Sequence, residues 1–238
     1  MRSAFRVLRI TAFLVFGACH GDYGGAPEQR ALTTVNVRLP LALELGQLDT
    51  AVVTVLDQYG APIAVSSVSW SSSRPEIVSV SPTTGAMLAI APGSAVITAS
   101  VDGKTAQKTV SVFASPIRLN EVRPDGSARE GWLELFNPSE APIDLSGWTL
   151  TNGDVFRAFG LPSGTTIPAG GFLIVDETSL PGGLGSADAV HVFSRFGVQV
   201  DAFAWTTDVN TSFGRCPDRT GSFVTTTTAT RGAANSCL

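Results

Sequence analysis

The stretch that decides the fold runs from Ile117 to Asp154 and reads IRLNEVRPDGSAREGWLELFNPSEAPIDLSGWTLTNGD. Its apolar residues fall into three short runs, at 117–122, 132–136 and 148–151, which are separated by turn sequences such as Pro-Asp-Gly and Asn-Pro. The Asn-Gly pair that follows predicts a tight hairpin, because both central positions of a type I′ turn need a positive φ. Short strands with a turn signal about every 8–12 residues predict a β-sandwich or barrel.

The second run has two faces, because side chains alternate along a strand. Leu133 and Leu135 share one face, which we expect to fill the core. Trp132, Glu134 and Phe136 share the other and form the candidate contact face, since aromatic rings beside a carboxylate suit sugar stacking or protein recognition. The alternative is that the opposite sheet or a long loop covers these three side chains.

The second half of the chain contains, in this order, the segments LNEVRPDG, GWLELFNPSE, DLSGWTLTNGD, TTIPAGGFLIV and GRCPDRTGSFVTTTTATRGAAN. Together these segments resemble a lamin tail domain, an immunoglobulin-like fold that also occurs in exported bacterial proteins. The chain departs from the family pattern at Cys216 and Arg219, in the closing turn. The resemblance implies an immunoglobulin-like sandwich over residues 117–238 with a non-catalytic role.

Residues 33–113 form another β-rich block, in which Asp102-Gly103 is a hairpin signal. The segments VTVLDQYGAPI, VSWSSSRPEIVSV, APGSAVITASVDGK and KTVSV resemble a bacterial Ig-like domain of group 2. The fold class that we predict is therefore all-β, with two immunoglobulin-like β-sandwich domains in tandem after an N-terminal signal peptide. The junction at 113–116 is very short, which predicts restricted motion between the two domains, and the alternative is an ordinary hinge.

Residues 1–18 have the layout of a secretory signal, with three arginines before a short apolar run. Phe16-Gly17-Ala18-Cys19 resembles a bacterial lipobox, which implies lipid attachment at Cys19, although Phe16 stands where that family usually has Leu. The alternative is cleavage by the general signal peptidase. Residues 19–32 read as a flexible tether. This layout predicts an exported protein that a lipid anchors to the membrane, in the outer membrane or at the cell surface of a bacterium.

The two cysteines that follow Cys19 are Cys216 and Cys237. In an exported protein such a pair usually forms a disulfide, which here closes a loop of about twenty residues and contributes about 3 kcal/mol in the chain-entropy model. Free thiols and an intermolecular bridge are the alternatives. Charge argues against nucleic-acid binding, because the chain carries a net charge of −4 and no cluster of Lys and Arg that could neutralise phosphates.

The sequence shows no nucleophile elbow, no CxxC pair and no glycine-rich phosphate loop, and it predicts no enzyme activity and no cofactor. His20 lies in the tether, and His191 reads as a half-exposed strand residue. Glu121 and Glu134 lie on successive strands and could approach each other. They could be Ca²⁺ ligands or an acid/base pair. The alternative is that they are two solvated strand residues, or carboxylates paired with Arg118 or Arg123, and these interpretations stay open at this stage.

We therefore expect a non-catalytic cell-envelope lipoprotein that acts as a surface adhesion or binding module through its Ig-like domains. The expected partners are an envelope polysaccharide or protein, together with the membrane through the lipid anchor. The alternative function is a structural spacer or presentation scaffold without a dedicated ligand.

Overall fold

The computed structural model describes residues 29–65, 67–125, 130–154 and 156–237. The predicted signal peptide at 1–18 and the predicted lipid-attachment residue Cys19 lie outside these residues. The described chain is all-β, which confirms the predicted fold class, and its one helical turn is the 3-10 helix η1 (Glu177–Ser179). Within the described ranges, no helix has the length and apolar character needed to cross a membrane.

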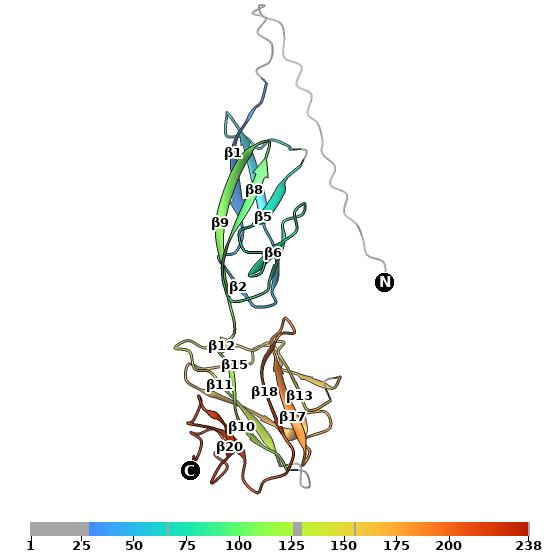
Figure 1. The fold of residues 1–238 in the computed structure, drawn as a ribbon, viewed down its shortest axis with the longest axis vertical. Helices are drawn as coiled ribbons and strands as arrows, with labels where there is room; N and C mark the ends of the chain where they lie inside the picture. The colour runs from blue at the N-terminus through green and yellow to red at the C-terminus, as the bar shows by residue number, and fades with distance from the viewer. Residues whose placement is uncertain (1–28, 66, 126–129, 155, 238) are drawn as a thin grey trace, which may run out of the picture.

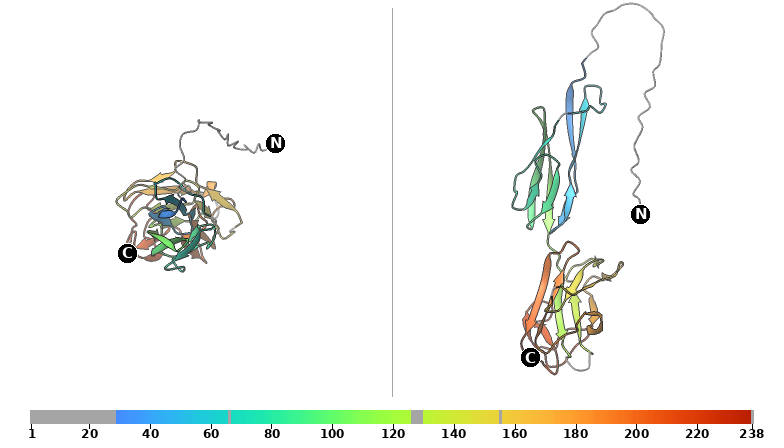
Figure 2. Two further views of the ribbon diagram at one scale, coloured as in Figure 1. Left: turned by 90° about the horizontal axis from the view of Figure 1, so that it is seen from above. Right: turned by 90° about the vertical axis from the view of Figure 1, so that its right-hand side faces the viewer.

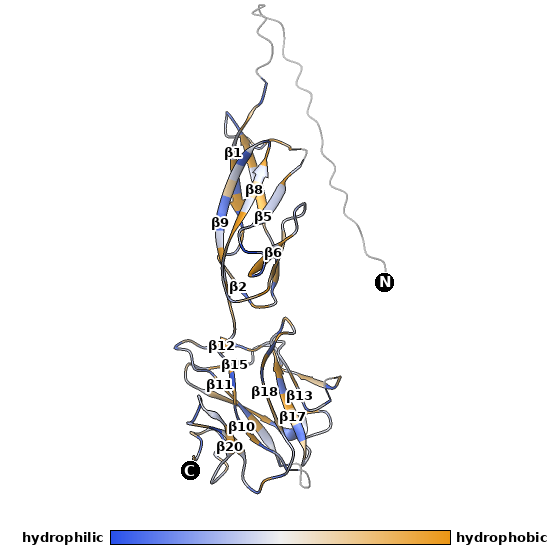
Figure 3. Cartoon of the chain, viewed as in Figure 1, coloured by the Kyte–Doolittle hydropathy of each residue, from blue (hydrophilic) through white to orange (hydrophobic). Residues whose placement is uncertain are grey.

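The strands gather into two separate bodies that lie end to end (Figures 1 and 2). Each body has its own cluster of buried apolar side chains, one built from residues 39–112 and the other from residues 117–205. Hydrophobic and hydrophilic residues alternate along strands such as β9 (Lys104–Phe113), as Figure 3 shows. This alternation turns one face of each sheet towards its core.

The first body packs a four-stranded sheet, β2-β9-β8-β5, against a three-stranded sheet, β3-β7-β6, with β1 and β4 as a separate pair. The predicted turn at Asp102-Gly103 joins β8 to β9, and both residues have a positive φ as a type I′ turn requires. Trp70 is buried in this core, as expected. The other strands are β1 (Leu32–Arg38), β2 (Ala42–Glu44), β3 (Leu48–Thr50), β4 (Val52–Asp57), β5 (Ser69–Ser72), β6 (Val78–Val80), β7 (Ala86–Ala89) and β8 (Gly93–Val101).

The second body packs a five-stranded sheet, β16-β11-β10-β19-β20, against a four-stranded sheet, β14-β13-β17-β18, with β12 and β15 as a short pair. Trp148 and Trp205 are buried in the core between the sheets, as expected. The strands are β10 (Arg118–Arg123), β11 (Trp132–Phe136), β12 (Ile143–Asp144), β13 (Thr149–Thr151), β14 (Ala158–Gly160), β15 (Thr166–Ile167), β16 (Phe172–Asp176), β17 (Asp188–Phe193), β18 (Gln199–Trp205), β19 (Phe213–Cys216) and β20 (Ser222–Thr225).

The tight turn predicted at Asn152-Gly153 is wrong in detail. A hairpin does join β13 to β14, but residues 152–157 separate the two strands, and neither Asn152 nor Gly153 has a positive φ. The Asn152 side chain is buried and donates hydrogen bonds to the carbonyl oxygens of Pro181 and Gly183, at 3.2 and 3.1 Å. The hydrogen bonds to the loop at Pro181 and Gly183 therefore determine the backbone conformation at Asn152, and the local turn preference of Asn-Gly does not.

The two bodies contact each other closely across the junction at 114–117. Buried Glu44 forms an ion pair with Arg195, at 3.2 Å between Oε2 and Nη2. Gly46 sits so close to the β17–β18 turn that an added Cβ would lie 2.4 Å from Val198 Cγ2. These contacts agree with the restricted motion that the short junction predicts.

Gly46→Ala should weaken the contact between the two bodies, because its Cβ would meet Val198 and also Phe196 Cβ at 3.1 Å. Gly60→Ala is the matched control, since Gly60 has a similar positive φ but an added Cβ there meets nothing within 4 Å. Both variants should lose about 1 kcal/mol of stability from left-handed backbone strain. Only Gly46→Ala should broaden the distance distribution between spin labels on the two bodies; identical distributions would contradict the close contact.

Candidate functional site

A β-bulge at Asn120 places two consecutive polar residues on the same face of the five-stranded sheet. Leu119 pairs with Leu135 and Glu121 pairs with Glu134, so the register between β10 and β11 shifts by one residue at Asn120. Leu119 and Val122 both lie in the core although they are three positions apart. Regular alternation cannot produce that spacing, so the bulge turns Asn120 and Glu121 together to the opposite face.

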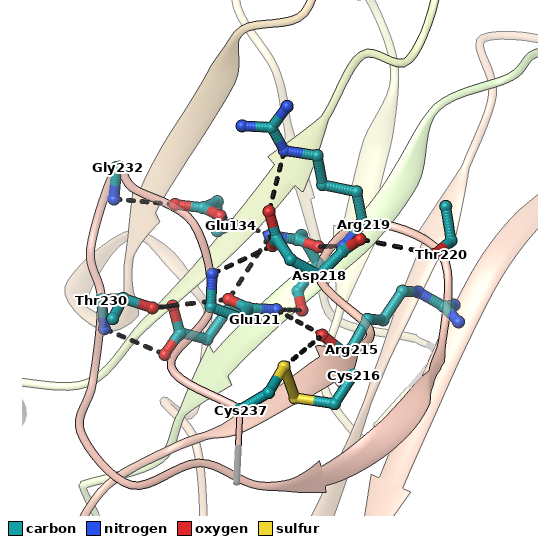
Figure 4. Close-up of polar contacts among 12 residues, drawn as sticks. Glu121, Glu134, Arg215, Cys216, Asp218, Arg219, Thr220, Thr230, Gly232 and Cys237 are labelled. Carbon is teal, nitrogen blue, oxygen red and sulfur yellow. Dashed lines mark hydrogen bonds and ion pairs between the residues drawn. A yellow bond between two sulfur atoms is a disulfide. The ribbon is translucent and has the colours of Figure 1, made fainter.

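Glu121 is fully buried on that face and accepts hydrogen bonds from two later segments of the chain. Oε1 accepts from the Ser212 hydroxyl and from the backbone N–H of Thr230, the latter at 3.0 Å. Oε2 accepts from the Thr230 hydroxyl at 2.8 Å. Glu121 therefore joins the residue before β19 to the segment that follows β20, and Figure 4 shows its contacts with Thr230.

Glu134 is the second fully buried carboxylate and lies directly opposite Glu121. Its Oε1 accepts a hydrogen bond from Asn120 Nδ2 at 2.9 Å, and its Oε2 accepts one from the Gly232 N–H at 2.7 Å. Burial raises the pKa of Glu134 to about 7; these two hydrogen bonds oppose the rise, and the charges of Glu121 and Asp218 add to it. The group therefore changes its protonation near neutral pH.

Asp218 and Asn235 complete this polar cluster. The N–H of Asn235 donates to Asp218 Oδ1 at 3.0 Å, and the Asn235 side chain donates to the carbonyl oxygens of Asn120 and Arg215, at 3.1 and 3.0 Å. We call the segment from Thr226 to Asn235 the C-terminal strap. It lies over the outer face of the sheet, and the carboxylates of Glu121, Glu134 and Asp218 all accept hydrogen bonds from it.

The predicted disulfide between Cys216 and Cys237 is confirmed, with the two Cα atoms 5.7 Å apart. It joins the end of β19 to the residues directly after the strap (Figure 4). Covalent and hydrogen-bonded constraints therefore hold the same segment. The bridge is distinct from the Glu121 and Glu134 contacts, which lie further back along the strap.

The structure buries the candidate contact face of Trp132, Glu134 and Phe136, whose exposed fractions are 3%, 0% and 5%. Gly232 in the strap contacts Glu134, and the guanidinium of Arg219 lies 4.8 Å above the Phe136 ring. The expected exposed face is therefore wrong, and the covering loop that was the alternative is the observed arrangement. The strap comes from a distant part of the sequence, which local alternation does not reveal.

Glu121 and Glu134 do approach each other, as the strand order suggested, but they are not solvated. No ion pair links them to Arg118 or Arg123 within the described residues. Their oxygens accept hydrogen bonds from Asn120, Ser212, Thr230 and Gly232 and are closed to solvent, so a substrate has no access to them as they stand. In the part of the chain that the structure describes, no group of three or more His, Cys, Asp or Glu residues could hold a metal ion.

An open pocket lies at the end of the second body, where Arg123, Trp132 and Asp176 occupy one row across β10, β11 and β16. Its volume is about 470 Å³, and Glu130, Gly131, Thr178 and Arg231 complete the lining. His191 is half-buried on β17 and lies 3.1 Å from Gln199, as a strand residue facing its neighbour.

The signal for the polar cluster was present in the sequence only in part. The spacing of Leu119 and Val122, which conflicts with simple alternation, could have indicated the bulge. Asp218 and Asn235 could not have been found in this way, because they are 98 and 115 residues from Asn120. Their role depends on the strap folding back over β10 and β11.

The polar cluster predicts a specific dependence of stability on pH. Because the pKa of Glu134 is raised from 4.5 to about 7, the folded state keeps a proton that the unfolded state loses. The free energy of unfolding should therefore fall by about 3 kcal/mol as pH rises from about 4.5 to 7, and level off above that. Denaturant titrations across this range should show the slope in the native sequence and in Glu140→Gln, an exposed control, but not in Glu134→Gln. An unchanged slope in Glu134→Gln would contradict the assignment.

Gly214 on β19 lies in close contact with both ends of the strap. An added Cβ would lie 2.8 Å from Thr226 Cγ2 and 2.9 Å from Asn235 Nδ2. Gly214→Ala should therefore cost about 1–3 kcal/mol through overpacking and loosen the strap. Gly160→Ala is the control, since it is also a strand glycine but has open space around it. Chemical denaturation and proteolysis of the strap measure both effects; equal stability of the two variants would contradict the packing argument.

Comparison with known proteins supports part of the predicted architecture. Residues 113–208 match the family model described as Lamin Tail Domain. A search of curated proteins found no match to the chain. The predicted resemblance of residues 33–113 to a group 2 bacterial Ig-like domain stays a prediction.

Several solved structures show weaker similarity. Domains 4 and 5 of the S-layer protein SbsC are 27% identical, with a TM-score of 0.31, over 36% of this chain and 54% of that one. Domains 5–6 of SbsC are 18% identical, with a TM-score of 0.32, over 77% and 100%. A C-terminal fragment of intimin, in complex with the intimin-binding domain of the translocated intimin receptor, is 13% identical, with a TM-score of 0.28, over 75% and 64%. The chain thus spans about half the length of the first of these structures, and its second body carries the match to the lamin tail domain.

Proposed function

We propose that this protein is an exported, non-catalytic binding module of the bacterial cell envelope. The observation that carries the proposal is the arrangement of the two bodies end to end (Figure 1). The described chain enters the first body at the end away from the junction, and β10 leaves the junction and runs along the second body (Figure 1). Arg123, which lines the pocket, is the last residue of β10 and so lies at the end of that strand away from the junction. A ligand site at that end is well placed for contacts away from an N-terminal anchor.

The disulfide between Cys216 and Cys237 supports export. Disulfides of this kind persist in oxidising compartments such as the periplasm and the cell surface, and are rare in the cytosol. Attachment through a lipid at Cys19, with residues 19–32 as a tether, completes the proposed placement in the outer membrane or at the cell surface. An anchored chain of this kind would present its second body furthest from the membrane.

The burial of the carboxylates supports a non-catalytic role. General acid or base catalysis requires a group within hydrogen-bond reach of the substrate. Glu121 and Glu134 have no solvent exposure, and the strap donates hydrogen bonds to both. The two carboxylates therefore serve to hold the strap in place. The expected partner is an envelope polysaccharide or protein that the protein binds and does not convert chemically.

A pull-down tests this function. The ectodomain from residue 31 to 238 should be immobilised with its disulfide intact and exposed to envelope extract from its own cells, with a heat-denatured ectodomain as the control. We expect a saturable partner that the native ectodomain retains and the control does not. Recovery of no saturable partner across a range of salt and Ca²⁺ concentrations would contradict the binding function.

A structural spacer is the second candidate function, and the close contact at Gly46 and the Glu44–Arg195 ion pair favour it. Contacts that restrict motion between the bodies would hold an attached group at a fixed distance from the membrane. A spacer has no need for a ligand pocket at its end. The pull-down therefore separates the two functions, because a spacer without a dedicated ligand retains nothing.

A further inference from the structure

The end pocket of the second body is built from residues of several separate segments. Arg123 ends β10, Trp132 begins β11 and Asp176 ends β16, and the three side chains lie in one row across neighbouring strands. Thr178 comes from η1, and Arg231 comes from the C-terminal strap. Residues directly opposite on neighbouring strands point to the same face of a sheet. The pocket therefore lies on the outer face, beside the end of the strap.

A buried carboxylate holds the floor of the pocket in place. Glu177 Oε2 accepts a hydrogen bond from the Gly131 N–H at 3.1 Å, and Oε1 accepts one from the Leu184 N–H at 3.0 Å. No side chain fits at Gly131, because an added Cβ would lie 2.3 Å from that carboxylate. The backbone on which the pocket stands is thus fixed without a ligand, which lowers the entropy cost of binding.

Arg123 has ion-pairing capacity that the described protein does not use. Its Nη1 donates one hydrogen bond to the carbonyl oxygen of Glu130, at 3.3 Å. No carboxylate within the described residues forms an ion pair with it. A planar guanidinium with free donors matches the two oxygens of a carboxylate.

The second guanidinium in the pocket, Arg231, has only a surface ion pair. Its Nη2 lies 2.7 Å from Asp176 Oδ1, and about half of each side chain is exposed. Exposed pairs of this kind contribute about 0–1 kcal/mol, so a ligand can compete with it at little cost. Asp176, Glu130 and Thr178 supply oxygen acceptors around the two guanidiniums. Such a mixture suits a ligand that carries one acidic group and several hydroxyl groups.

We propose that this pocket binds a uronic acid unit of an acidic polysaccharide. The ligand carboxylate pairs with Arg123 and Arg231, and the sugar hydroxyls donate to Asp176, Glu130 and Thr178. The volume of about 470 Å³ lies in the range of small-molecule pockets, about 300–1,000 Å³. This inference rests on the proposed binding function and names the chemistry of its ligand.

The test is a titration of the ectodomain, residues 31–238, with digalacturonate, followed by calorimetry and by NMR chemical shifts. We expect saturable binding that Arg123→Gln weakens at least tenfold. Arg118→Gln is the matched control, because Arg118 lies at the other end of β10 and is exposed. It should bind as the native protein does. Thermal unfolding of both variants checks that the fold is intact.

The methyl ester of digalacturonate separates acid recognition from sugar recognition, and glutarate separates the sugar from a simple dicarboxylate. Both should bind at least tenfold more weakly than digalacturonate. Equal binding of either compound, no binding of digalacturonate, or no effect of Arg123→Gln would overturn the proposal. The pull-down distinguishes this failure from that of the proposed function: a partner that Arg123→Gln still retains would leave the binding function standing and remove the uronic acid site.

Discussion

The second body depends on the β-bulge at Asn120. Without the extra residue, Glu121 would point into the core or Val122 would point out of it, because side chains on a regular strand alternate. With the bulge, Val122 stays among the buried apolar residues on the inner face of the sheet, while Asn120 and Glu121 face the strap on the outer face. One inserted residue thus creates a polar surface on the outer face of a sheet whose inner face remains apolar.

Without further hydrogen-bond donors this polar surface would destabilise the fold, because a buried carboxylate that accepts no hydrogen bonds is strongly unfavourable. The strap supplies the missing donors through the Gly232 N–H and through the N–H and hydroxyl of Thr230. The strap has few apolar side chains, so hydrogen bonds to the carboxylates, and not a hydrophobic interface, hold it against the sheet. The pKa of Glu134 stays raised, mainly because the carboxylate is buried and to a smaller extent because Glu121 and Asp218 lie nearby.

The sequence was informative where structure is local. Alternation along β11 separated Leu133 and Leu135 from their polar and aromatic neighbours, and the core uses that division. The pairing of Cys216 with Cys237 needed only a count of cysteines and the expected compartment. The sequence-based predictions were wrong where contacts with distant segments determine the structure. Hydrogen bonds to Pro181 and Gly183 fix the conformation at Asn152, and the strap, whose Gly232 is 98 residues from Glu134, covers the outer face of β11. A pattern with a period of two carries no information about such a cover.

The strap also determines where a ligand can bind. It removes the middle of β11 from the surface, so the aromatic row that the sequence offered as a contact face serves as packing surface beneath it. At the start of β11, Trp132 is buried as well, but Arg123 and Asp176 on the two neighbouring strands stay at least partly exposed, and there the strap contributes Arg231. A change that loosens the strap at Glu121 or Gly214 would therefore also displace one guanidinium of the pocket. The stability of the C-terminal strap and the proposed ligand binding at the end of the second body therefore depend on the same ten residues.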